Sequence, residues 1–222
     1  MQGSLFDSKL HFFAQPEFAG SSTKLLDLFA EWRFNDAFHF RVGQFRTPYS
    51  RAYITPLTNL QLTTRGLVID QFGLGRDTGA MASGSLAEGL FHYDIAVVNG
   101  ATINDHSGDR DAPAVIGRAE FRFGDLIPYD QAPSLVLDDP NGLTLGFGGA
   151  FARRGITGAQ GVSTEQLWNV AADLAWTRGP VSLRTEGFWR TARRSPRPAN
   201  AFGVYARGRE AARARSARGL AH

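Results

Sequence analysis

Residues 25–42 read LLDLFAEWRFNDAFHFRV and predict two β-strands joined by a tight turn. Apolar side chains occupy every second position over 26–34 and again over 38–42. Such alternation is typical of a strand with one apolar face. Residues 35–37, Asn-Asp-Ala, supply the turn between the two runs. The stretch therefore predicts an antiparallel hairpin whose second face carries acidic and basic side chains.

The same two-residue alternation recurs along the chain. It is clear over 80–98 and 168–190, and weaker over 115–124 and 143–152. Short turns are predicted at 35–37, 87–89 and 178–180, and long polar links near 15–23, 47–76, 99–114, 153–164 and 192–201. The link at 124–142 breaks this rhythm, because it is long where a short turn is expected. About ten strands can be counted, the last over 201–206.

Aromatic side chains gather near the ends of the apolar faces. They are Trp32, Phe34, Phe38, Phe91, Tyr93, Trp168, Trp176 and Trp189. Transmembrane β-strands carry an outward apolar band flanked by aromatic girdles, and outer-membrane barrels alternate short turns with long loops. The sequence therefore predicts an all-β fold, an antiparallel transmembrane β-barrel of porin type, present as a partial barrel of about ten strands.

Composition narrows the classes of protein. The chain has 222 residues and no cysteine, which excludes disulfides and thiolate metal sites. The formal net charge of +3 is misleading, because residues 192–222 hold eight arginines and one acidic residue. We therefore predict no nucleic-acid partner. No apolar run is long enough for a transmembrane helix. No signal peptide is visible, and we expect that it has been lost.

Two segments are expected. Residues 1–206 form the porin-type β-barrel segment. Residues 207–222 form an Ala/Arg-rich tail, which is expected to be disordered or translated out of frame. A basic arm that contacts nucleic acid or anionic lipid is the weaker interpretation of this tail.

Four motifs resemble the phosphate-selective porin O/P family. They are FRVGQFRTPYS at 40–50, RDTGA at 76–80, YDIAVVNG at 93–100 and GPVSLRTE at 179–186. The resemblance implies an outer-membrane barrel of about 16 strands. It also implies a homotrimer through which small anions, including phosphate or polyphosphate, diffuse along an arginine-lined pore. The chain resembles an internal fragment of such a porin.

Arginines are the candidate pore-lining, anion-binding residues, because a cationic lining attracts anions. The candidates are Arg41, Arg46, Arg51, Arg65, Arg76, Arg118, Arg122 and Arg184. The long link after residue 46 is expected to fold inward and narrow the pore. In the alternative interpretation each arginine pairs with a carboxylate such as Glu31, Asp77, Glu120 or Glu186. Because the polar faces carry both signs of charge, a general, weakly anion-preferring pore is an equal expectation.

Partners and competing functions follow from these patterns. The expected partners are outer-membrane lipid and small anions, and no cofactor, metal site or catalytic constellation is predicted. The alternative is a soluble β-sandwich or small β-barrel binding module with a basic tail. In that protein the aromatic faces would form a core, so the exposure of the tryptophans distinguishes the two hypotheses.

Overall fold

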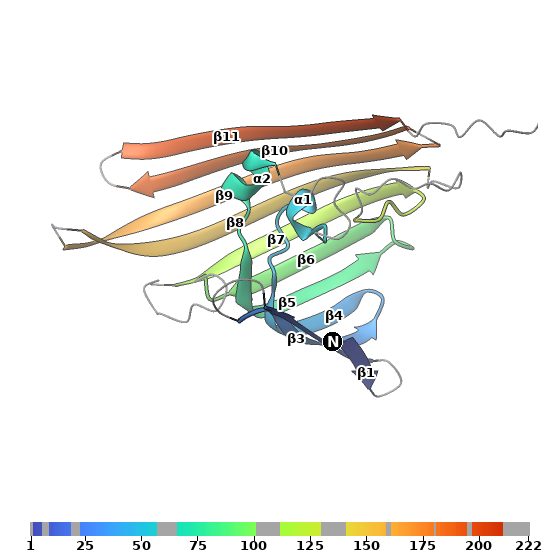
Figure 1. The fold of residues 1–222 in the computed structure, drawn as a ribbon, viewed down its shortest axis with the longest axis horizontal. Helices are drawn as coiled ribbons and strands as arrows, with labels where there is room; N and C mark the ends of the chain where they lie inside the picture. The colour runs from blue at the N-terminus through green and yellow to red at the C-terminus, as the bar shows by residue number, and fades with distance from the viewer. Residues whose placement is uncertain are drawn as a thin grey trace, which may run out of the picture.

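A single antiparallel sheet dominates the computed structural model, which describes residues 2–5, 9–18, 23–56, 66–100, 112–129, 141–158, 161–179, 181–194 and 197–210. The strands are β1 (Gln2–Leu5), β2 (Leu10–Glu17), β3 (Lys24–Asn35), β4 (Phe38–Arg46), β5 (Arg76–Leu86), β6 (Phe91–Val98), β7 (Ala112–Gly124), β8 (Gly142–Gly158), β9 (Gly161–Arg178), β10 (Val181–Arg194) and β11 (Arg197–Glu210). Each strand pairs with its neighbours in sequence (Figure 1). Within the described residues β1 and β11 do not pair, so the predicted porin-type fold is confirmed as an open, partial barrel of 11 strands.

The last hairpins are longer than predicted. The strands β8 and β9 contain 17 and 18 residues, and they pair continuously from Gly142 opposite Thr177 to Gly158 opposite Gly161. The expected long links near 153–164 and 192–201 are therefore wrong, because most of their residues are in strands. A tilted strand of about 9–11 residues crosses a bilayer. The strands continue past the part with alternating apolar residues. Their remaining residues are mostly polar or small and show no two-residue alternation, so the sequence pattern did not reveal them as strands.

The polarity of the sheet is inverted relative to a water-soluble protein. We call the face that carries Asp27, Glu120 and Glu186 the inner face, and the opposite one the outer face. Buried polar side chains on the inner face include Asp27, Glu31, Asp94, Arg118, Glu120, Asn169, Asp173 and Glu186. Exposed apolar side chains on the outer face include Leu28, Phe40, Ile95, Phe121, Phe147, Val170, Leu183 and Trp189. This arrangement is that of a transmembrane β-sheet.

Aromatic contacts mark two levels of the outer face. At the short-turn end, the ring centroids of Phe34 and Phe38 are 5.4 Å apart, and Phe91 and Phe121 are 5.1 Å apart. Farther along, Phe151 packs on Trp168 at 4.4 Å. Strands rise roughly 3.3 Å per residue, so Trp176 and Trp168 lie about 26 Å apart along β9. This spacing fits the two aromatic girdles of a membrane barrel.

A sandwich whose core is formed by the aromatic faces is excluded for the described strands. Trp168 and Trp189 are each 44% exposed, and no second sheet covers them among the described residues. The strand β11 continues past the predicted segment boundary at residue 206 and ends at Glu210. The rest of the predicted tail, residues 211–222, lies outside the described residues.

Two short helices cover the inner face. They are α1 (Arg51–Ile54) and α2 (Leu67–Phe72), and both lie in front of the sheet in Figure 1. Ser50 caps α1 by accepting a hydrogen bond from the backbone N–H of Tyr53 at 3.1 Å. Neither helix, within the described residues, has the length or apolar content of a membrane-crossing segment.

Candidate functional site

We call the connection between β4 and β5 the link, of which residues 47–56 and 66–75 are described. The link lies against the inner face and is held there at α1. The backbone N–H groups of Arg51 and Ala52 donate to the two carboxylate oxygens of Glu186, each at 3.0 Å. Glu186 is 2% exposed and projects from β10. The first N–H groups of a helix have no partner within the helix and carry partial positive charge. The carboxylate therefore accepts hydrogen bonds from the first N–H groups of α1 and fixes the position of the helix.

The side chain of Arg51 makes a second set of contacts. Its Nη1 lies 3.5 Å from Glu120 Oε1, and its Nη2 donates to the carbonyls of Ile127 at 2.8 Å and Pro128 at 3.2 Å. The guanidinium also lies over the ring of Tyr129, 4.6 Å from the centroid. The Arg51 side chain is only 8% exposed. This predicted pore-lining residue is packed between segments of the protein.

Glu120 is the centre of a buried charge cluster. Arg118 Nη2 lies 2.9 Å and Arg122 Nη2 2.8 Å from its oxygens, and the Tyr129 hydroxyl donates to it. Arg118 Nη2 also lies 2.6 Å from Asp173 Oδ2. The cluster follows from strand periodicity, because residues 118, 120 and 122 point to one face of β7. The alternative interpretation, in which each arginine pairs with a carboxylate, is confirmed for these residues.

Two glycines of β8 leave room for this cluster and for the link. A Cβ atom at Gly146 would lie 2.3 Å from Asp173 Oδ2 and 2.4 Å from Arg118 Nη2. A Cβ atom at Gly148 would lie 2.0 Å from the carbonyl oxygen of Tyr49. No Cβ atom fits at such distances, so both positions require glycine for this packing.

Arg190 holds the second helix, a role that the sequence interpretation missed. Its Nη1 and Nη2 donate to the carbonyls of Gln71 at 3.0 Å and Phe72 at 3.1 Å. The Phe72 ring stacks on Phe188 at 5.5 Å. Strand alternation places Arg190 on the same face as Glu186, and this was the signal available in the sequence.

Two further candidate arginines fasten the ends of the link. Arg76 pairs with Asp27 through two contacts of 3.0 Å, Nε to Oδ1 and Nη2 to Oδ2. This pair is a further case in which a candidate arginine meets a carboxylate of the inner face. Arg46 Nη1 donates to the carbonyls of Ile54 at 3.1 Å and Thr55 at 3.0 Å. Such multiple contacts use the planar geometry of the guanidinium.

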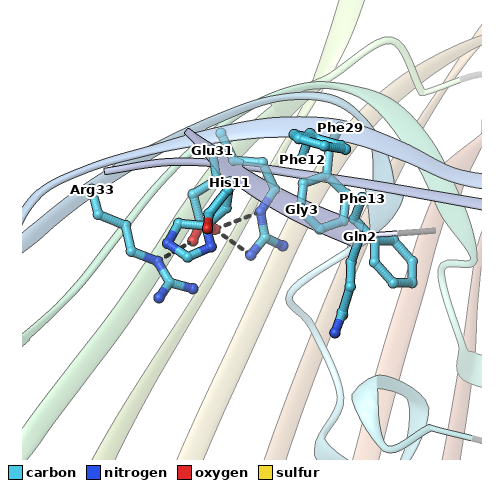
Figure 2. Close-up of a pocket in the computed structure, with 10 residues that line it drawn as sticks. Gln2, Gly3, His11, Phe12, Phe13, Phe29, Glu31 and Arg33 are labelled. Carbon is cyan, nitrogen blue, oxygen red and sulfur yellow. Dashed lines mark hydrogen bonds and ion pairs between the residues drawn. The ribbon is translucent and has the colours of Figure 1, made fainter. Parts of the chain in front are cut away.

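A cavity of about 400 Å³ lies beside β2, β3 and β4 and is shown in Figure 2. Arg33 Nε and Arg41 Nε each donate to Glu31 at 2.8 Å. The Arg33 and Arg41 side chains are 48% and 25% exposed. Two solvent-contacting guanidinium groups therefore share the one buried carboxylate of Glu31, which leaves a local surplus of positive charge.

A second cavity, of about 510 Å³, adjoins the first one through Arg41 and Phe29. It is also lined by Arg46 and Arg76. Three of the predicted arginines thus meet around one open space. Elsewhere, Arg184 donates to the carbonyl of Trp176 at 2.9 Å. Arg65 lies outside the described residues.

Comparison with known proteins supplies the family. The model of a family described as phosphate-selective porin O and P matches residues 1–123, more than half of the chain. An uncharacterized protein of Aquifex aeolicus (strain VF5) is 32% identical over 79 residues. That similarity covers 34% of this chain and 19% of the Aquifex protein, so it spans much less than two thirds of that relative. On the family match, the chain belongs to the phosphate-selective porin O and P family.

Proposed function

We propose that the full-length protein forms a water-filled channel in the bacterial outer membrane through which small anions diffuse passively. The observation that carries this proposal is the inverted polarity of the sheet. An outer face that exposes Phe147 and Trp189 requires lipid, whereas an inner face lined with carboxylates and guanidinium groups requires water. Membership of the porin family supports a channel rather than an enzyme, and also supports assembly as a homotrimer.

The link between β4 and β5 is proposed to narrow this channel. Its attachment to Glu186 and Arg190 holds α1 and α2 against the inner face, away from the barrel rim. A segment placed inside a lumen reduces its cross-section and brings solutes within reach of wall charges. In this proposal the described wall beside the link, together with the cavities near Arg41, is where solutes meet the protein.

The anion preference is proposed to arise at Arg33 and Arg41. Both side chains contact solvent, and the two share the single carboxylate of Glu31. By contrast, the arginines around Glu120 are largely buried, and that cluster also holds the carboxylate of Asp173. A modest preference for phosphate-like and other small anions is therefore proposed, with polyphosphate as a further candidate. For Arg65 a pore-lining role stays a prediction.

The test is a selectivity measurement. The full-length protein is reconstituted in planar lipid bilayers, and the reversal potential is measured across a KCl gradient. The proposal predicts stepwise channel insertions and a reversal potential that favours chloride over potassium. A protein that refolds without detergent and produces no conductance steps would contradict the channel. Equal permeability of the two ions would contradict only the anion preference.

A further inference from the structure

The segment 125–129 reaches the inner face from the end of the sheet opposite to the link. The strand β7 ends at Gly124, at the same end as the turns that join β3 to β4 and β5 to β6. The link at 47–56 enters from the other end, after β4. Ile127 is 2% exposed, so the 125–129 segment folds inward against the protein. The alternation of short turns and long links along the chain predicts a short turn at this place instead.

Arg51 connects residues 47–56 of the link to the 125–129 segment. Its backbone N–H is bound to Glu186, whereas its guanidinium binds the carbonyls of Ile127 and Pro128. These contacts join parts of the chain separated by 135 residues on one side and 76 on the other. We call this contact between residues 47–56 and residues 125–129 the joint. Tyr129 is part of it, because its ring lies under the Arg51 guanidinium and its hydroxyl donates to Glu120.

We propose that Arg51 is a positioning residue that locks the link 47–56 to the 125–129 segment, so that the constriction of the channel is built from both ends of the barrel. The inference deepens the proposed channel function and rests on it. In this arrangement Arg51 does not attract solutes, because its charge is buried and met by Glu120. Its role depends on the planar guanidinium, which reaches a carboxylate and two carbonyls at once.

A measurement that needs no conductance tests the joint directly. Hydrogen–deuterium exchange is followed in the detergent-solubilised full-length protein and its Arg51→Gln variant. Loss of charge-assisted hydrogen bonds predicts an increase in exchange of about tenfold in the peptide that covers 125–129. The matched control is Arg122→Gln, which removes another partner of Glu120 but leaves the contacts of Arg51 with Ile127 and Pro128 in place. Unchanged exchange at 125–129 in Arg51→Gln would overturn the inference.

Bilayer recordings separate positioning from charge. Arg51→Lys keeps the positive charge but lacks the planar group with its several donors. The inference predicts that Arg51→Lys and Arg51→Gln both increase transitions between conductance levels and leave the reversal potential unchanged. A lysine variant identical to the wild type, beside a glutamine variant with only a shifted reversal potential, would overturn it and make Arg51 a pore-lining charge. If the wild type forms no channel, the proposed function fails, and the exchange result still decides whether the joint exists.

Discussion

The two sides of the inner face use arginine in opposite ways. Beside β7–β10, the side chains of Arg118 and Arg51 are 0% and 8% exposed, and they meet Glu120 and other groups in a filled interior. Beside β2–β4, Arg33 and Arg41 border open cavities and are 48% and 25% exposed. The same residue type is therefore buried in the packing of the link on one side and open to solvent on the other.

Burial explains this difference. A charge removed from water is stable only when partners replace its hydration, and removing one partner of a buried pair is costly. An ion pair that stays hydrated contributes little to stability. We therefore expect substitutions beside β7–β10 to affect folding, and substitutions beside β2–β4 to affect selectivity. The following predictions test that contrast, from the largest expected effect to the smallest.

The largest effect is expected at Glu120. The Glu120→Ala substitution leaves Arg118 and Arg51 buried with one carboxylate fewer, which should lower the free energy of unfolding by about 3–5 kcal/mol. Urea unfolding, followed by heat-modifiable gel migration, measures this change. The matched variant is Glu31→Ala, which should cost at most about 1 kcal/mol because Arg33 and Arg41 keep their water. Equal losses in the two variants would remove the contrast.

A steric substitution should displace the link. In Gly148→Val the new side chain meets the carbonyl of Tyr49, which lies 2.0 Å from the position of a Cβ atom. Overpacking of this kind costs about 1–3 kcal/mol, so we expect the link to undock and the single-channel conductance to rise. The control is Gly149→Val, because a Cβ atom there has no atom within 4 Å. A conductance that responds equally to both substitutions would contradict the docking of the link.

Selectivity should respond on the open side. The double substitution Arg33→Gln and Arg41→Gln should shift the reversal potential toward potassium and leave the gel migration of the folded protein unchanged. The control is the single substitution Arg178→Gln, since Arg178 is exposed at the end of β9 and lies outside both cavities. If the control shifts the potential as far as the double variant, the cavity arginines do not set the preference.

The smallest effect is expected for alkaline pH. Burial, followed by the nearby Glu120 charge, raises the pKa of Tyr129 above its ordinary value. The neutral hydroxyl is therefore retained in the folded state, and its stabilising contribution is present below pH about 10 and lost as the pH rises further. Channel noise should be constant from neutral pH to about pH 10. A rise in noise that begins near pH 9 and is half complete at about pH 10 would show that Tyr129 titrates with the ordinary tyrosine pKa and is not buried at the joint.

Strand alternation was sufficient to predict which residues lie on each face. It assigned Trp168 to the outer face and Glu120 to the inner face, and both assignments are confirmed. It did not predict the pairing of Arg51 with Glu120, because the two residues are 69 positions apart and their contact depends on how the link docks. The helices α1 and α2 contain 4 and 6 residues, too few for a helical period to emerge.

The central claim is that the outer face meets lipid, and tryptophan fluorescence tests it most directly. Single-tryptophan variants of the full-length protein that retain only Trp168 or only Trp189 are reconstituted in vesicles with and without brominated lipid. The inverted sheet predicts strong quenching of both residues by bromine and weak quenching by aqueous acrylamide. Strong acrylamide quenching without bromine quenching would place these side chains in water and contradict the membrane barrel.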